Sequence, residues 1–146
     1  MKKENAGTLL IQLGNAVTWL RNQKMQSIDL TSSQSGIIQY ILRHPHEKVT
    51  AGNLIERLRL SKPTISKIIK LLERKGLVER STDNKDLRKR IIVLTKKGQS
   101  LEEELQRIDQ QAEEILLYGM TAEETAQFLG LLQKALENLH KRKGMP

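Results

Sequence analysis

Residues 50–76 read TAGNLIERLRLSKPTISKIIKLLERKG, and this stretch decides the fold. Thr50 and Ser61 are residues that favour helix N-caps, and each precedes apolar residues at helical spacing. A brief turn separates the two runs, and Gly76 follows the second, as is typical just past a helix C-terminus. The stretch therefore predicts a short helix, a tight turn and a longer helix, which together form a helix-turn-helix.

The second of these helices has two chemically different sides. Its apolar residues are spaced to face a core, and they are Ile65, Ile68, Ile69 and Leu72. Its polar residues fall on the other side, and they are Lys62, Thr64, Ser66, Lys67 and Lys70. A helix that is polar at its N-terminal turns and anchored by apolar residues can present side chains to base edges and phosphates. The polar set is therefore our candidate DNA-contacting surface.

The hydrophobic period changes after this helix. Residues 77–81 and 88–94 favour strands, and residues 82–86 between them are rich in turn formers, which predicts a hairpin with a charged tip. A basic hairpin beside a recognition helix is a wing, whose tip can place an arginine in the minor groove. Arg88 is that candidate, and Lys85, Lys89 and Arg90 flank it. Asp86 lies two residues before Arg88 and can hold its guanidinium by a bidentate pair.

Helices are predicted on both sides of this region. Residues 6–25 predict one helix. A second helix begins at the capping-box sequence that starts at Thr31, and this helix ends before Pro45. Residues 96–118 predict one long helix, and Thr121 begins the last. The sequence thus predicts a mainly α-helical protein with one small β-hairpin.

The positive charge is concentrated in the middle of the chain. The 146 residues carry a net charge of +8, whereas residues 47–98 alone hold 15 Lys and Arg against 6 Asp and Glu, a net of +9. Such a region is typical of a protein that binds the phosphate backbone, although a solvated basic face gives the same count. The aromatic content of 3% argues against a single-strand binder that stacks bases on aromatic rings.

Other properties exclude several classes of protein. The chain has no cysteine, which excludes disulfides, thiolate metal sites and thiol redox sensing. No apolar run has the length of a membrane span, and the N-terminus lacks the features of a signal peptide, so we expect a cytoplasmic protein without membrane contact. No nucleophile triad, Gly-rich phosphate loop or metal-hydrolase motif is present, so an enzyme is not expected.

Two segments resemble the MarR family of bacterial transcriptional regulators. Residues 86–98, DLRKRIIVLTKKG, are similar to the family's wing signature D-x-R-x-x-x-[V/I]-x-L-T-x-x-G. Residues 72–78, LERKGLV, resemble its exit from the recognition helix, L-E-x-x-G-L-[VI]. The start of the second helix, Leu30-Thr31-x-x-Gln34, also matches, and the helix order fits over nearly the whole chain.

The resemblance implies a winged helix-turn-helix over residues 31–95, flanked by helical dimerisation regions at 1–30 and 96–146. It implies a homodimer on double-stranded DNA with an inverted-repeat operator. Two-fold symmetry would place the two recognition helices about one DNA turn, ~34 Å, apart. By the same resemblance Pro63 joins the recognition-helix set, Arg88 is the minor-groove residue, and Lys89 and Arg90 belong to the DNA-contacting wing.

Family members commonly respond to small aromatic molecules held between the two regions. Trp19 and Tyr40 could line such a pocket, although single aromatics on helix faces are more often core residues. No cofactor is expected. The only histidine cluster is His44 and His46 beside Glu47, and it fits a helix end and loop better than a metal site.

Three functions agree with these patterns. The first is a sequence-specific transcriptional regulator, usually a repressor in this family, released from its operator by a small molecule. The second is a winged-helix module that binds an acidic protein partner. The third is a non-specific DNA-binding protein. The sequence does not indicate the operator, the ligand or the regulated genes, nor does it separate repression from activation.

Overall fold

The computed structural model describes residues 3–142. Its helices and strands follow one another in the predicted order, with a 3₁₀ turn at Met25–Ile28 after the first helix. The elements are α1 (Ala6–Lys24), α2 (Ser32–Arg43), α3 (Ala51–Leu58), α4 (Lys62–Arg74), β1 (Val78–Thr82), β2 (Arg90–Leu94), α5 (Lys96–Gln99), α6 (Glu102–Leu116) and α7 (Ala122–His140). The mainly α-helical fold with one hairpin is thereby confirmed.

The predicted helix starts are confirmed by their caps. Thr31 and Gln34 form a complete capping box, with the Gln34 amide 3.2 Å from Thr31 Oγ1 and the Thr31 amide 3.0 Å from Gln34 Oε1. Thr121 and Glu124 repeat this arrangement at α7. Each box pairs two amides that a helix N-terminus would otherwise leave without partners.

The single helix predicted over residues 96–118 is wrong. The structure divides it into α5 and α6, with a turn at Ser100 and Leu101. Ser100 Oγ donates a hydrogen bond to the Lys97 carbonyl at 2.6 Å, and the Leu101 amide bonds to Gly98 rather than to Lys97. Such local bonds by serine compete with the regular helix, and an unbroken apolar spacing does not reveal them.

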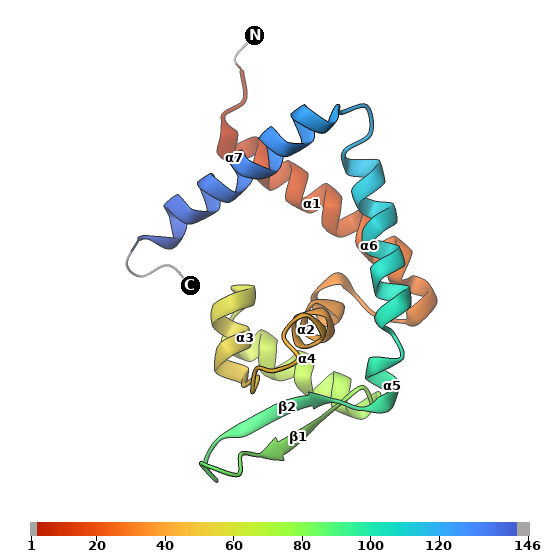
Figure 1. Cartoon of the computed structure of the whole chain (residues 1–146), viewed down its shortest axis with the longest axis vertical. Coiled ribbons are helices and arrows are strands. Elements are labelled where there is room, and N and C mark those ends of the chain that lie inside the picture. The colour runs from red at the N-terminus through yellow and green to blue at the C-terminus, as the bar shows by residue number, and fades with distance from the viewer. Residues whose placement is uncertain (1–2, 143–146) are drawn as a thin grey trace.

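One core joins the hairpin to the helices (Figure 1). Residues from α2, α3 and α4 form its centre, and the base of the hairpin closes it. Met25, Leu30, Leu105 and Ile108 also belong to it, although they come from the regions predicted to dimerise. In Figure 1 α6 runs from this core up to α7, and α7 crosses near α1 on the side away from the hairpin.

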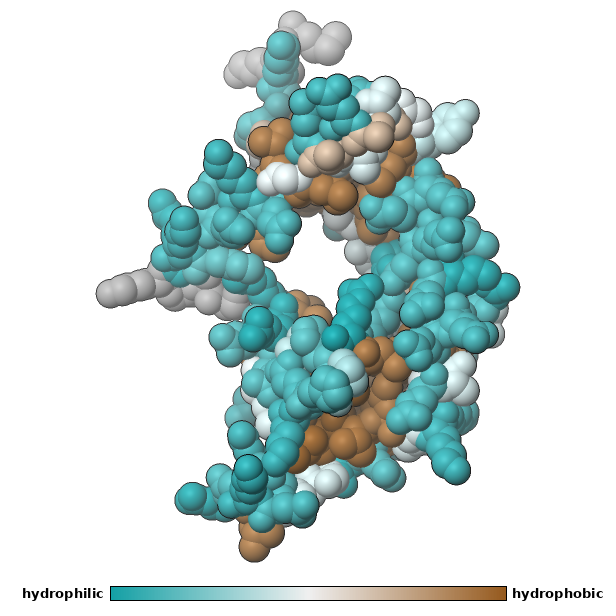
Figure 2. All heavy atoms as spheres, viewed as in Figure 1, coloured by the Kyte–Doolittle hydropathy of each residue, from teal (hydrophilic) through white to brown (hydrophobic). Residues whose placement is uncertain are grey.

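The outer helices are poorly covered within one chain. Neither α1 nor α7 contains a buried residue. Their exposed large apolar side chains are Leu9, Leu10, Ile11, Trp19, Leu129, Leu131, Leu136 and Leu139. Figure 2 shows hydrophobic residues gathered over this end of the molecule. Within residues 3–142, no helix is both long and apolar enough for a membrane span.

Gly98 has a steric role at the join between hairpin and helix. A Cβ placed there would lie 2.2 Å from the Leu77 carbonyl oxygen, so α5 packs directly on the backbone that enters β1. We predict that Gly98→Ala lowers the free energy of unfolding by about 1–3 kcal/mol, because the backbone must move apart.

The matched control is Gly36→Ala in α2, where a Cβ has nothing within 4 Å. That variant is expected to gain about 0.5–1 kcal/mol, because alanine favours the helix. Urea unfolding of both variants measures the effect. Equal stability changes for the two glycines would contradict the close packing at residue 98.

Candidate nucleic-acid interface

The predicted helix-turn-helix is formed by α3 and α4. Thr50 caps α3, and Arg59 ends it in a left-handed conformation with φ of 54°. Ser61 then caps α4, where its Oγ accepts the Thr64 amide at 3.3 Å and lies 2.8 Å from Thr64 Oγ1. Pro63 occupies the first turn of α4, where its missing amide proton costs nothing. The turn is therefore specified by local chemistry.

The two sides of α4 are separated as predicted. Ile65, Ile68, Ile69 and Leu72 are buried. Of the candidate DNA-contacting residues on α4, Ser66 is partly buried and the others are exposed, namely Lys62, Pro63, Thr64, Lys67 and Lys70. The buried side fixes the helix on the core, so the exposed side is presented on a rigid element.

The hairpin lies next to this helix pair. Its strands pair antiparallel from Val78 opposite Leu94 to Thr82 opposite Arg90. β1 packs against α4 and β2 against α3, so the hairpin and the helix-turn-helix form one unit. Arg88, Lys89 and Arg90 are all exposed at or beside the tip. The structure thus places the basic residues of the predicted wing on a hairpin that packs beside α4.

Asp86 and Arg88 form an ion pair, but it involves one carboxylate oxygen and is not the predicted bidentate pair. One carboxylate oxygen of Asp86 accepts both the Arg88 amide, at 3.1 Å, and Arg88 Nε, at 3.5 Å. The amide bond folds the tip into a tight turn, and the arginine keeps a single long contact with the carboxylate. The Arg88 side chain is 94% exposed. Asp86 therefore shapes the turn and leaves the guanidinium open to a partner.

Sequence reasoning missed the role of Asp83. Its position predicts a turn former at the exposed tip, but Asp83 is only 5% exposed. Its Oδ1 accepts Lys48 Nζ at 2.9 Å and the Lys85 amide at 3.1 Å. The turn bond to Lys85 is local and could have been suspected from sequence. Lys48 lies 35 residues away, and no spacing rule indicates that contact.

The hydrogen bond from Lys48, supported by the Lys85 amide, lowers the pKa of Asp83 below its ordinary value. Because the pKa is lower in the folded state, ionised Asp83 stabilises the fold above the ordinary aspartate pKa of about 4. That contribution is lost as pH falls through the lowered pKa. We predict that the stability difference between the wild type and Asp83→Asn is largest above pH ~4 and shrinks in more acid solution. Denaturant unfolding at several pH values measures it, and a difference independent of pH would contradict the account.

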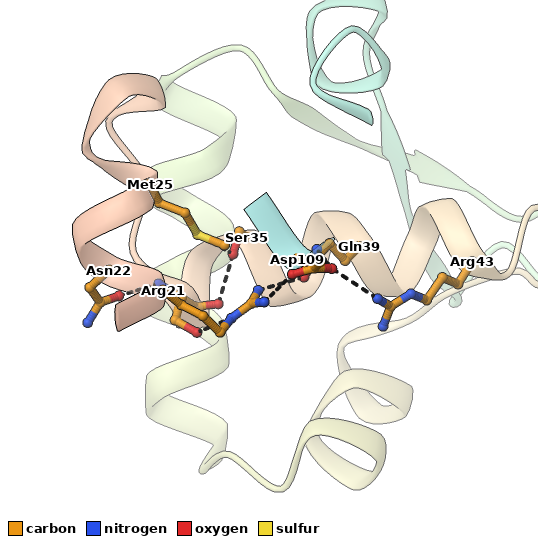
Figure 3. A network of polar contacts seen from close by, with 8 residues as sticks. Arg21, Asn22, Met25, Ser35, Gln39, Arg43 and Asp109 are labelled. Atoms are coloured by element: carbon orange, nitrogen blue, oxygen red, sulfur yellow. Dashed lines mark hydrogen bonds and ion pairs between the residues drawn. The ribbon is translucent and has the colours of Figure 1, made fainter. Parts of the chain in front are cut away.

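A polar network joins the winged helix to the outer helices (Figure 3). Arg21 of α1 forms an ion pair with Asp109 of α6, and its guanidinium also donates to Gln39 Oε1 at 3.0 Å. Gln39 Nε2 donates to Asp109 Oδ2 at 2.6 Å, and Arg43 Nη2 reaches the same oxygen at 3.2 Å. Figure 3 shows the two arginines approaching Asp109 from opposite sides. The network ties three helices together where the two predicted regions meet.

A cavity of about 290 Å³ adjoins this network. Its apolar lining comes from Val17, Leu20, Ala112 and Leu116, and its polar lining from Arg21, Gln39, Arg43, Asp109 and Glu113. Polar or charged residues thus supply five of the nine lining side chains, and convergent polar groups of this kind orient ligands in small-molecule sites. Neither Trp19 nor Tyr40 lines it, so the structure does not bring the two candidate ligand residues together there.

The two aromatic candidates have different surroundings. Tyr40 is 8% exposed, stacks on His44 and donates to the Glu47 carboxylate at 3.0 Å, as a core residue would. Burial, followed by the Glu47 hydrogen bond, raises the pKa of Tyr40. Trp19 is 62% exposed, so its interpretation as a core residue is wrong for this chain. The apolar spacing of α1 marks a face that one chain leaves open.

Known proteins share this arrangement. Residues 28–89, which contain α2 to the hairpin tip, match the model of the MarR family. The uncharacterised HTH-type transcriptional regulator YwaE of Bacillus subtilis is 37% identical over 81 residues, which are 56% of this chain and 47% of that protein. The match therefore spans about half of that relative. A second B. subtilis relative, the uncharacterised HTH-type transcriptional regulator YybA, is 24% identical over 88% of this chain and 85% of its own.

The solved structures extend the match to the outer helices. The MepR–DNA complex of S. aureus is similar to this chain with a TM-score of 0.85 and 28% identity, over 94% of this chain and 100% of MepR. The fold, the helix-turn-helix and the basic hairpin define a winged-helix protein, and these matches show that the chain is similar to proteins of the MarR family.

Proposed function

We propose that this chain is a sequence-specific transcriptional regulator that binds double-stranded DNA as a homodimer. The observation that carries the proposal is the joint exposure of two basic elements fixed on one core. The exposed residues of α4 suit a major groove, and Arg88 on the neighbouring hairpin suits the minor groove beside it. Support comes from the relatives, two of which are named as HTH-type transcriptional regulators, while MepR was solved in complex with DNA.

The homodimer rests on the uncovered outer helices. Leu131 of α7 is 66% exposed, Ile11 of α1 is 68% exposed, and Tyr118 between α6 and α7 is 89% exposed. Figure 2 also shows an open space between the α1–α7 end and the winged helix, bordered by α6. An apolar surface of this extent is costly in water. A second copy would cover these faces and supply a second recognition helix for an inverted repeat.

Salt dependence and competition test DNA binding against the two alternatives. Log K on the operator is expected to fall with log salt by about 0.9 per neutralised phosphate. Operator DNA should also outcompete random DNA by at least about a thousandfold. Equal affinity for both DNAs would favour the non-specific binder. Absence of DNA binding by a folded dimer would favour the protein-interaction module.

We also propose that the regulator is a repressor, released when a small aromatic molecule enters the cavity between α1, α2 and α6. The support is the position of the cavity, beside the Arg21–Asp109 pair that joins the outer helices to the winged helix. A ligand that binds one domain arrangement better shifts the population toward it, by no more than its difference in affinity.

Aromatic carboxylates and phenols are suitable probes for this cavity. We expect them to lower the operator affinity of the wild type. In Leu116→Trp the larger side chain fills the cavity, so the probes should no longer lower operator affinity. Ile115→Trp, on the exposed neighbouring position, is the matched control and should keep the response. Equal responses in the two tryptophan variants would place the ligand elsewhere.

A further inference from the structure

The segment Lys48–Thr50, just before α3, attaches three parts of the interface. The Val49 carbonyl accepts the Ile92 amide at 2.8 Å, so β2 is paired on this side as well as with β1. Thr50 caps α3. Lys48 reaches the hairpin and donates to Asp83. Three consecutive residues thus hold the middle of β2, the first helix of the helix-turn-helix and the entrance to the tip.

Asp83 lies where both strands enter the tip. Its amide donates to the Lys89 carbonyl at 3.0 Å, which continues the strand pairing beyond Thr82 opposite Arg90. Its carboxylate binds Lys48 Nζ from one side and the Lys85 amide from the tip. At 5% exposure this carboxylate has little access to water, so its charge depends on these two donors.

We infer that Lys48 is a positioning residue, which through Asp83 sets the direction of the tip and therefore the reach of Arg88. The inference rests on the proposed contact between wing and DNA. Without the ammonium of Lys48, the Asp83 carboxylate would turn toward water and release the Lys85 amide. The tip would then sample more orientations, and binding would have to restrict them, which lowers affinity without removing any DNA contact.

Four variants test the inference on the full-length chain. Lys48→Met removes the ammonium and keeps the apolar stem, whereas Lys48→Arg keeps a cation. Asp83→Asn removes the carboxylate charge. The double variant Lys48→Met with Asp83→Asn has the net charge of the wild type but no ion pair, so it separates positioning from overall charge.

The first readout needs no DNA. Hydrogen exchange at the Lys85 and Lys89 amides is expected to quicken in Lys48→Met and to return toward the wild-type rate in Lys48→Arg. Exchange in α2 should stay unchanged, which would show that the fold is intact. Unaltered exchange at the tip in Lys48→Met would overturn the inference whatever the DNA results are.

The second readout is the effect of Arg88→Ala in each background. The double variant Lys48→Met with Asp83→Asn is expected to bind operator about fivefold more weakly than the wild type, since ordering one long side chain on binding costs about that factor. Arg88→Ala should cost less in that background than in the wild type, because the arginine is no longer held in place. An equal cost in both backgrounds would overturn the inference. If the wild type binds no DNA, the proposed function fails instead, and the exchange result still decides whether Lys48 orders the tip.

Discussion

Replacement of Arg88 by alanine is expected to weaken operator binding by roughly 5- to 150-fold, the range for loss of one base-contacting arginine. The physical reason is the geometry of the tip. The guanidinium is 94% exposed and has only a 3.5 Å contact with Asp86, so it is available to a groove of negative potential. The same exposure means that the fold loses almost nothing when the side chain is removed.

Arg107→Ala is the matched control for this experiment. Arg107 is also an exposed arginine, but it lies on α6, outside the basic region, and pairs with Glu104. Fluorescence anisotropy on labelled operator should show near wild-type affinity for this variant, and thermal melting should show that both variants are folded. If Arg88→Ala binds as tightly as Arg107→Ala, the hairpin is not a DNA-contacting wing.

Introduction of a charge on α7 is expected to abolish both dimerisation and operator binding. Leu136 is 49% exposed in the single chain and belongs to the apolar face that a second copy would cover. Leu136→Glu would place a carboxylate in that face on both copies, where desolvation and mutual repulsion oppose association. A monomer carries one recognition helix, so the loss of operator affinity should be at least about a thousandfold.

Sedimentation equilibrium provides the measurement. The wild type is expected at twice the chain mass of 16.7 kDa, and Leu136→Glu at that mass itself. Leu87→Glu is the control, because Leu87 is a leucine 78% exposed at the hairpin tip, away from α7. It should remain dimeric. A wild type that sediments as a monomer, or a Leu136→Glu variant that remains a dimer, would contradict the proposed assembly.

Much of the fold could be predicted because local signals agreed with one another. At α4, the Ser61 cap, the early Pro63, the apolar spacing and Gly76 all indicate the same helix, and Gly76 adopts φ of 73° as its position requires. The hairpin followed from the change of period after this helix. Both kinds of signal lie within a few residues of the element that they specify.

The unpredicted features depend on distant or competing contacts. The break between α5 and α6 follows from a Ser100 side-chain bond that apolar spacing does not reveal. The burial of Asp83 depends on Lys48, which approaches only when the hairpin packs beside α3. Trp19 lies on an apolar face of α1 whose spacing is the same as that of a core face. It is exposed because no other part of residues 3–142 packs over that face. The DNA-contacting residues and the boundaries of the dimerisation regions stay predictions.

Binding-site selection from random duplex DNA at near-physiological salt tests the central claim most directly. We expect recovery of an inverted repeat whose half-sites lie about one helical turn apart, because a two-fold dimer presents α4 twice. The protein should first be unfolded and refolded, so that no bound small molecule holds it in a released state. Failure of a folded dimer to enrich any motif would contradict a sequence-specific regulator.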